Sequence, residues 1–389
     1  MSRSRSQPSA PPPCYALVHP GLEAIAAEEI EGDLGGEVKK TGSGIVVFRL
    51  PEIDERVLQL RTTEDVFLLA WGSDQLTHRA EDLERIRRWT ARDADWPALL
   101  RIHHALRPKP KGRPTYHLVA QMEGRHGYLR RDARKALAQG LAGTVPESWR
   151  PVEENAAVEF WLTIHGATAV CGLRLSDRTM RHRMYKLEHR PASLRPTIAA
   201  SMIRLAEISP RHIVLDPMCG AGTLLAERLS APPTPALPHK GGGRTVHPPP
   251  LGGRAGVGGG GYATVWGGDV DFSAVRAAAV NLRRLGPALL ARWDATRLPL
   301  ASAAVDRIVS NPPFGKQLSS PEAVVPLYRA MLREYDRVLR PGGLAVLIVS
   351  AAAALRSAVG HVGWKARQQL SLRVLGQPAV ITVWRKPDS

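Results

Sequence analysis

The second half of the chain alternates short apolar runs with segments of helical periodicity. Strands that alternate with helices predict a doubly wound α/β domain with a mostly parallel sheet. The last segment contains two alternating strands around Gly-Gln-Pro, which predicts an antiparallel hairpin at the edge of that sheet. The predicted strands, with the loops that follow them, lie in 211–220, 262–271, 288–300, 304–314, 344–350 and 365–386, and the predicted helices in 222–229, 273–286 and 321–343.

The first half mixes both periodicities less regularly, which predicts an α+β region from Cys14 to about Ser176. Residues 1–13 have no apolar core and are interpreted as a disordered tail rather than a secretory signal. Residues 177–195 form a basic linker between the halves. Residues 231–261 consist largely of Pro and Gly, and we interpret them as an inert surface insertion rather than an arm that folds on RNA.

The net charge of the chain indicates more about its partner than the hydrophobic content does. The chain has 389 residues, enough for two or three domains, and 44% of them are hydrophobic, as is usual for a globular protein. Its 53 Lys and Arg against 36 Asp and Glu give a net charge of +17. A balance this basic favours a polyanionic partner, nucleic acid first, although a generally basic surface is the alternative.

Cysteine spacing and apolar run length indicate where the protein works. Its three cysteines form no CxxC pair and no disulfide framework, which indicates a reducing compartment. The longest apolar run, 344–355, is too short to span a bilayer. We therefore expect a soluble cytoplasmic protein.

Acidic residues at the ends of three predicted strands suggest a cofactor site. The first strand runs into "VLDPMCGAGTLL", where glycines let the backbone approach a ligand and a helix begins with free N–H groups. A GxGxxG fingerprint and a Walker sequence are both absent, and a carboxylate instead precedes the glycines, which suits an amine-bearing ligand. The next two strands end in Asp269, placed to bind ribose hydroxyls, and Asp294, placed to accept from the adenine amine. The expected cofactor is S-adenosylmethionine, held by Asp216, Pro217, Cys219, Gly220, Gly222, Thr223, Asp269 and Asp294.

Each of these features alone has a simpler interpretation. A Gly loop after a strand can be an ordinary tight turn, and an Asp at a strand end can cap a helix. Cys219 stands where several small residues would serve, so it is assigned no chemistry. The order of the features, ending in "NPPF", makes chance agreement a poor explanation.

The fourth predicted strand ends in Asn311-Pro312-Pro313-Phe314, a stiff segment in which the prolines fix φ and remove donors. With "DPMCGAGTLLAE", "GGDVD" and "WDATRLPL", this "NPPFG" resembles class I S-adenosylmethionine-dependent methyltransferases that modify exocyclic amines. The resemblance runs from about Arg195 to the C-terminus and implies a Rossmann-like domain. It implies that Asn311 and the Pro312 carbonyl accept the two amine hydrogens while Phe314 stacks on the base. A paired target base would have to flip out of its helix.

The first half of the chain narrows the range of possible substrates. The stretch from Thr115, "TYHLVAQMEGRHGYLRRDARKALAQGL", resembles a THUMP domain, and "YALVHPGLEAIAAEEI" resembles the ferredoxin-like segment that accompanies it. Residues 101–150 carry 11 Lys and Arg against 3 Asp and Glu, which supports RNA binding. We expect four residues of one helix to meet phosphates, although each alone is compatible with a solvated helix face: Arg130, Arg131, Arg134 and Lys135.

The junction "RHRMYKLEHRPASLRPTIAASMIRLA" is similar to that of THUMP-bearing tRNA guanine-N2 methyltransferases, most closely those that act on position 6 of the acceptor stem. This likeness implies that Ser193 lies beside the methionine end of the cofactor. It also implies a ferredoxin-like segment (14–80), a THUMP-like RNA-binding domain (81–176), the linker (177–195) and the methyltransferase domain (196–389). The insertion departs from the family pattern.

The expected function is thus the formation of N2-methylguanosine in tRNA by a monomer that uses no metal and no membrane. Three alternatives stay open: another tRNA guanosine, ribosomal RNA, or an RNA-binding protein with a vestigial methyltransferase fold. The "NPPF" motif by itself does not fix the substrate. The THUMP-like half, however, disfavours DNA adenine and a protein glutamine amide. A non-catalytic module would not need all six candidate residues, so their presence argues against the vestigial interpretation: Asp216, Gly220, Gly222, Asp269, Asp294 and Asn311.

Overall fold

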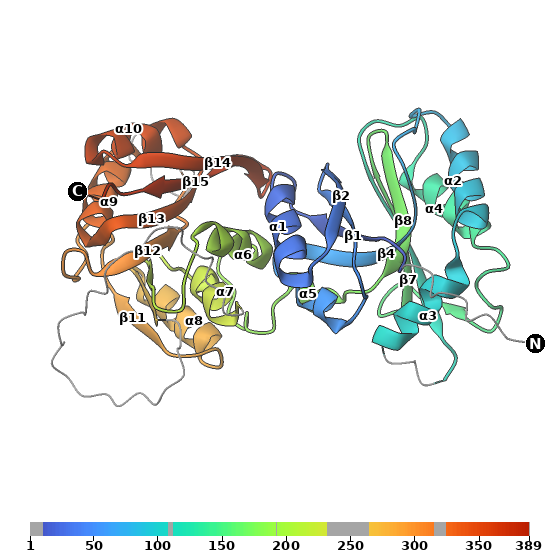
Figure 1. Cartoon of the computed structure of the whole chain (residues 1–389), viewed down its shortest axis with the longest axis horizontal. Helices are drawn as coiled ribbons and strands as arrows, with labels where there is room; N and C mark the ends of the chain where they lie inside the picture. Colours follow the sequence, from blue (N-terminus) through green and yellow to red (C-terminus); the bar gives the residue numbers. More distant parts are fainter. Residues whose placement is uncertain (1–10, 108–111, 192, 232–263, 315–323, 389) are drawn as a thin grey trace, which may run out of the picture. The chain divides into compact units, whose positions relative to one another are not determined.

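The computed structural model describes residues 11–107, 112–191, 193–231, 264–314 and 324–388. The chain divides into two compact units, Met1–Arg183 and Met184–Ser389 (Figure 1). The Pro/Gly-rich insertion expected at 231–261 lies outside the described residues except for its first residue, and residues 1–10 of the expected tail also lie outside them. Each unit has its own sheet.

The first unit is built on one eight-stranded sheet with the strand order β2-β3-β1-β4-β8-β7-β5-β6. Strand β5 pairs in parallel with β6 and β7, and the other neighbours are antiparallel. The elements are β1 (Cys14–Val18), α1 (Glu23–Leu34), β2 (Glu37–Gly42), β3 (Ile45–Arg49), a 3₁₀ turn (Glu55–Gln59), β4 (Thr63–Ser73), α2 (Glu81–Arg92), α3 (Trp96–Leu106), β5 (Thr115–Glu123), α4 (Arg130–Gly140), β6 (Arg150–Pro151), β7 (Val158–His165), β8 (Thr168–Arg174) and α5 (Arg178–Arg181).

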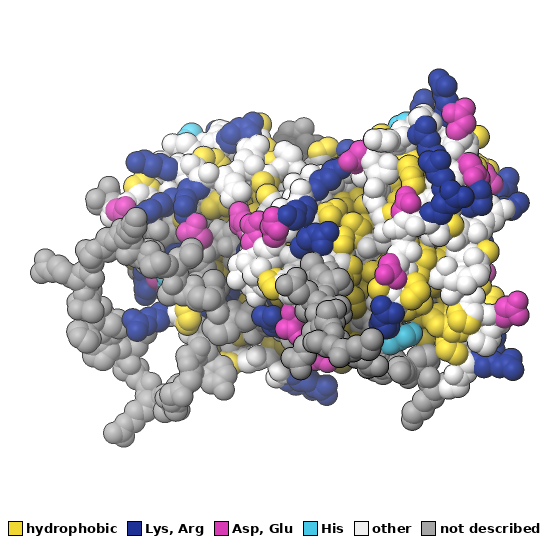
Figure 2. Space-filling model, turned by 45° about the vertical axis from the view of Figure 1, so that its right-hand side comes forward, with side chains coloured by type: hydrophobic (Ala, Val, Ile, Leu, Met, Phe, Trp, Pro, Cys, Tyr) yellow, Lys and Arg dark blue, Asp and Glu magenta, His cyan; other side chains and the backbone are white. Residues whose placement is uncertain are grey.

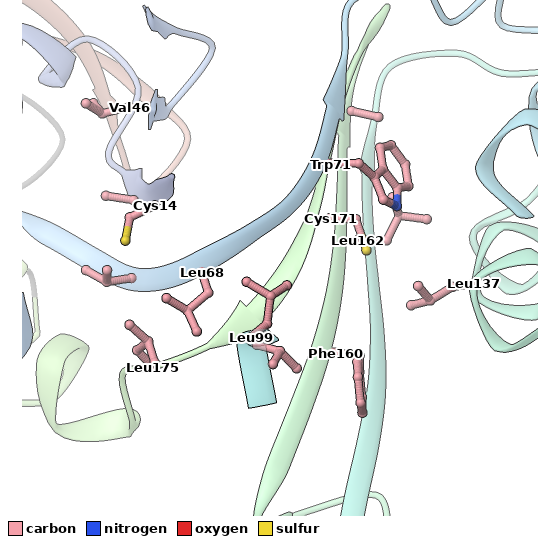
Figure 3. Packing of buried hydrophobic residues seen from close by; sticks show 14 of the residues in the cluster. Cys14, Val46, Leu68, Trp71, Leu99, Leu137, Phe160, Leu162, Cys171 and Leu175 are labelled. Carbon is pink, nitrogen blue, oxygen red and sulfur yellow. The ribbon is translucent and has the colours of Figure 1, made fainter. Parts of the chain in front are cut away.

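One sheet and a shared hydrophobic cluster join the two segments of this unit. Strand β4 pairs with β8, with Leu68 opposite Leu173, so residues 14–80 and 81–176 share one sheet. Figure 3 shows Leu137 of α4 pointing towards the strands that carry Leu162 and Trp71. The α+β prediction is confirmed, whereas the finer division into ferredoxin-like and THUMP-like parts stays a prediction.

The second unit is built on a seven-stranded sheet with the order β11-β10-β9-β12-β13-β15-β14. The five strands from β11 to β13 are parallel, and β15 and β14 are antiparallel additions at one edge. The predicted doubly wound sheet with an edge hairpin is thus confirmed. The elements are α6 (Pro196–Leu205), β9 (Ile213–Asp216), α7 (Thr223–Ser230), β10 (Thr264–Asp269), α8 (Phe272–Leu282), β11 (Ala288–Arg292), β12 (Val305–Ser310), α9 (Val324–Val338), β13 (Leu339–Val349), α10 (Ala352–Val362), β14 (Lys365–Val374) and β15 (Gln377–Arg385).

The periodicity did not predict α6 or α10, and it placed the start of β13 too late. Strand β13 begins at Leu339, so Pro-Gly-Gly lies inside the strand instead of ending the helix. Gly342 has a φ of 72°, and the register against β12 shifts nearby, so this strand absorbs a local kink. Among the described helices, none has both the length and the apolar character that crossing a membrane requires.

Candidate active site

Four adjacent strands bring the predicted site residues to one edge of the second sheet. In the order β11-β10-β9-β12 all four strands are parallel, so their carboxyl ends meet at the same edge. Asp216 is the last residue of β9, Asp269 is the last of β10, and Asn311 follows β12 directly. Asp294 comes two residues after β11. This edge is where α/β sheets bind their ligands.

The loop between β9 and α7 leaves room for a ligand. Gly220 has a φ of 53°, and a Cβ atom added there would meet nothing within 4 Å, so the loop is open on that side. Gly222 has a φ of 76° and packs against α8, where an added Cβ would lie 3.0 Å from the Cβ of Ala278. Gly220 thus leaves one side of the loop open, and Gly222 lets the loop pack closely against α8. Burial raises the pKa of the Cys219 thiol well above its usual range, in keeping with a packing role.

Asp216 is buried, with 2% of its surface exposed. Its Oδ1 accepts hydrogen bonds from Ser310 Oγ at 3.0 Å and from the Met218 amide at 3.2 Å. Burial raises the pKa of Asp216 to about 7, and nearby Asp269 adds to the rise, while the two hydrogen bonds only partly oppose it. Asp216 therefore connects the loop between β9 and α7 to β12, the strand that ends directly before Asn311.

Asp269 holds the loop from the other side. Its Oδ2 accepts from the Gly220 amide at 3.0 Å, and its Oδ1 accepts from the Asp271 amide at 3.0 Å. Asp271 caps α8 by accepting from the hydroxyl and the amide of Ser273, and these hydrogen bonds lower the pKa of its carboxyl. Asp294 is exposed, and its Oδ1 accepts from the amide and the hydroxyl of Thr296.

Asn311 presents an acceptor that the fold leaves unused. Its Oδ1 is buried and has no hydrogen-bond partner in the described structure. Buried carbonyl oxygens are nearly always paired, so such an atom at the ligand edge of a sheet suggests that its partner comes from a substrate. Pro312 is buried, whereas Pro313 and Phe314 are half-buried. Residues 315–323, which follow, lie outside the described range.

The second half of the predicted linker belongs to this site. Residues 184–191 and 193–195 form a strap along α7 and α8. Tyr185 donates to Glu227 of α7 at 2.7 Å, and Arg190 donates to Ser273 at 2.6 Å and forms an ion pair with Asp271. Ser193 Oγ lies 3.5 Å from Thr223 Oγ1 at the start of α7, which places the Ser193 side chain beside the loop.

Asn281 of α8 connects the strap to the loop, a role that the sequence pattern does not indicate beyond placing one polar residue in an apolar helix. The side chain is 3% exposed and uses all four of its hydrogen-bonding positions. Its Oδ1 accepts from the amides of Leu187 and Glu188, both at 2.8 Å. Its Nδ2 donates to the carbonyls of Glu188 at 3.0 Å and Ala221 at 2.9 Å.

The four predicted RNA-binding residues lie together on α4 of the first unit, and all four are exposed. Two grooves run between this helix and β5. One has a volume of about 530 Å³ and is lined by Arg131, Arg134 and Lys135, and the other has about 310 Å³ and is lined by Arg130, Arg131 and Arg134. Figure 2 shows Lys and Arg side chains gathered on one part of this unit. Cations along a groove suit an extended polyanion.

Comparison with known proteins identifies the family. A family model described as "RMKL-like, methyltransferase domain" matches residues 183–376. Residues 183–376 of the protein therefore belong to the RMKL-like methyltransferase family. Its loop, with open space at Gly220 and an acid at each of the next two strand ends, fits S-adenosylmethionine, the methyl donor of this class.

Relatives extend the match beyond the methyltransferase domain. The tRNA (guanine(6)-N2)-methyltransferase of Thermus thermophilus is 28% identical over 350 residues, which are 88% of this chain and 91% of that protein. Bovine tRNA (guanine(6)-N(2))-methyltransferase THUMP3 is 31% identical over 279 residues, 65% of this chain and 48% of that protein. Bovine U6 snRNA (guanine-N(2))-methyltransferase THUMPD2 is 31% identical over 214 residues, 54% of this chain and 36% of that protein. The methyltransferase thus spans less than half of each of these two mammalian relatives.

Solved structures agree on the fold. The crystal structure of TrmN from Thermus thermophilus matches with a TM-score of 0.71 and 25% identity, covering 96% of this chain and 99% of that one. A putative methyltransferase, SMU.472, complexed with SAH, matches with a TM-score of 0.67 and 15% identity, covering 98% and 99%. The class I fold is therefore the one expected from the sequence. Among the described residues, no group of His, Cys, Asp and Glu could hold a metal ion.

Asp216→Asn tests the buried carboxyl. In the unfolded chain this group ionises near pH 4, whereas the fold keeps it neutral up to about pH 7. Its stabilising contribution is therefore complete below pH 4 and is lost as the pH rises towards and through 7. Without cofactor, the free energy of unfolding of the wild type should fall relative to the variant by up to about 4 kcal/mol over this window. Urea denaturation at a series of pH values measures this, and parallel pH profiles would contradict the assignment.

Asn281→Asp tests the connection between strap and loop. The variant keeps an acceptor for the amides of Leu187 and Glu188, but it sets an oxygen against the Ala221 carbonyl. We expect the cofactor affinity, measured by calorimetry, to fall by about tenfold. Val280→Ala, at an exposed position on the same helix, is the control and should leave the affinity unchanged. Equal affinities for wild type and Asn281→Asp would show that the loop holds its shape without this side chain.

Proposed function

We propose that this methyltransferase forms N2-methylguanosine in tRNA, at position 6 of the acceptor stem. Guanine-N2 is the target named for each of the three relatives described above, although the RNA differs between them. The relative matched over nearly its whole length is a tRNA enzyme, which favours tRNA for this chain. A tRNA substrate also agrees with the expected cytoplasmic location. The monomeric state and the absence of a metal stay predictions.

The observation that carries the proposal is the unpaired Oδ1 of Asn311. An exocyclic amine has its lone pair delocalised into the ring, so it is a poor nucleophile. Acceptors at Asn311 Oδ1 and the Pro312 carbonyl would hold the two amine hydrogens and turn the nitrogen lone pair towards the methyl group. They would also stabilise the positive charge that develops on nitrogen. Phe314 would set the plane of the base by stacking.

The residues of this chain would hold the donor along the carboxyl edge of the sheet. S-adenosylmethionine supplies an activated methyl group and its own leaving group, so no strong base is needed. The open side of Gly220 offers room for the donor, and Ser193 would lie near its methionine end. Asp269 would bind the ribose hydroxyls, and Asp294 would accept from the adenine amine. Asp216, being buried, would act by keeping the loop and the Asn311 strand in register.

The first unit would capture the RNA. Its grooves lie where β5 is only partly paired, because β6 covers Thr115 and Tyr116 alone. Arg and Lys side chains of α4 line them from the other side. These residues would bind phosphates without reading sequence, which leaves the choice of base to the second unit.

Asn311→Ala tests the function directly. We expect transfer to a tRNA transcript to fall by at least about 100-fold, while cofactor affinity changes by less than about threefold. Nucleoside mass spectrometry of the product RNA measures N2-methylguanosine, and fragment mapping locates it. A wild type that methylates only another RNA or another guanosine would refute the assigned substrate. An equal loss of transfer and of cofactor affinity would refute the assigned role of Asn311.

Arg130→Glu combined with Arg131→Glu tests the RNA surface. Affinity for tRNA should fall, and the slope of log affinity against log salt should become shallower by about two, because two phosphate contacts are lost. The control is Arg87→Glu with Arg88→Glu, an equal change of charge at exposed positions on α2 that do not line the grooves. Should the two double variants have the same salt slope, RNA would not bind along α4.

A further inference from the structure

The turn between β14 and β15 carries an apolar side chain where the backbone disfavours one. Leu375 and Gly376 connect the strands, with φ values of 49° and 78°. Positive φ at both central residues is the requirement of a type I′ turn, which favours Asn-Gly or Asp-Gly. A leucine in this left-handed conformation is strained, because its side chain crowds the backbone. Among the non-glycine residues with positive φ in the described chain, Leu375 alone has a large apolar side chain.

Burial of the Leu375 side chain does not offset this strain. The Leu375 side chain is 71% exposed, so it adds almost nothing to the core. A single exposed leucine on a surface needs no explanation, but one that is strained as well does. Strained residues that the fold itself does not require occur preferentially at functional sites.

The register of the sheet places this turn on the ligand side of the second unit. Ser310 of β12 lies level with Leu347 of β13, which pairs with Thr382 of β15. The hairpin continues past this level to the Val374–Gln377 pair, so it extends beyond the carboxyl end of β12. Five residues from Thr382 to Gln377, at about 3.3 Å each, correspond to a reach of about 16 Å. Figure 1 shows this hairpin running past the end of β13.

A hairpin that extends this far beyond the end of β12 could contact an RNA duplex while the target base of that duplex lies in the site. The base must travel inward to Asn311, while the helix that it left stays outside the edge of the sheet. The hairpin tip therefore stands outward from Asn311, on the side from which the RNA would arrive. Arg373, next to the turn, is exposed and donates to the Gly376 carbonyl, which both stiffens the tip and places a cation beside it.

We propose that Leu375 is a wedge that enters the base stack where the target guanine has flipped out. This inference rests on the proposed function. Extruding a base leaves its neighbours unstacked, and an apolar side chain that fills the gap stabilises the open duplex. A two-residue turn holds the leucine rigidly, so little conformational entropy is lost on insertion. Leu375 thus favours the flipped state of the RNA and takes no part in methyl transfer itself.

Leu375→Asn separates this role from a structural one, because asparagine fits the turn better than leucine does. The variant should unfold at the same temperature as the wild type or at a higher one. Its kcat/KM on a tRNA with a paired target guanosine should fall by about tenfold. On a matched tRNA with an abasic nucleotide opposite the target, flipping costs less, and the loss should be below about twofold.

The substitution also has a readout that needs no turnover. A tRNA with 2-aminopurine at the target position should become more fluorescent when the wild type binds, because the base leaves the neighbouring bases that quench its fluorescence. Leu375→Asn should lose most of that rise, and Leu375→Phe, which keeps an apolar wedge, should retain it. Leu289→Asn is the matched control, since Leu289 is 63% exposed on β11 at the opposite edge of the same sheet.

The outcomes are distinct. A preferential loss on the paired tRNA, with the fluorescence rise abolished, supports the wedge. Equal loss on both RNAs, or no loss on either, overturns it while the proposed function stands. A wild type that leaves both tRNAs unmethylated overturns the proposed function and this inference with it.

Discussion

The hydrogen bond from Ser310 to Asp216 is the interaction on which the site depends. It lies in the buried space between β9 and β12, where β9 leads into the loop before α7 and β12 ends directly before Asn311. Without a fixed distance between these two ends, an amine and a methyl group could not be held in line. The carboxyl is buried at the cost of a raised pKa, which shows that the fold gives up some stability at neutral pH to keep this connection.

In the rest of the site, side chains likewise hydrogen-bond to backbone groups of the loop between β9 and α7. Asp269 holds the Gly220 amide, Asn281 holds the Ala221 carbonyl, and Trp293 donates to the Pro217 carbonyl at 3.0 Å. Three side chains, from β10, from α8 and from the residue after β11, thus fix three points of one loop. Such a loop is preorganised before any ligand arrives, and this suits a reaction that relies on positioning more than on acid–base chemistry.

Much of this arrangement was predictable from the sequence, and the rest was not for identifiable reasons. The strand rhythm and the order of Asp216, Gly220, Asp269, Asp294 and Asn311 along the chain predicted one ligand edge, because parallel strands must end on the same side. Asn281 and Ser310 were missed because their roles depend on contacts between residues about 60 and 94 positions apart, and no local pattern records these. The strap was taken for a linker because its composition is basic and polar. Helix α10 was missed because its alanine-rich start continues the apolar run of β13.

The continuous sheet of the first unit has an evolutionary consequence. Because β4 and β8 pair along most of their length, removing either flanking segment would leave the other with a long unpaired edge, which invites aggregation. The two segments can therefore be gained, lost or exchanged between genes only together. A lineage that keeps the arginine-lined groove must also inherit the strands of residues 14–80 in the same sheet, whether or not those strands touch RNA.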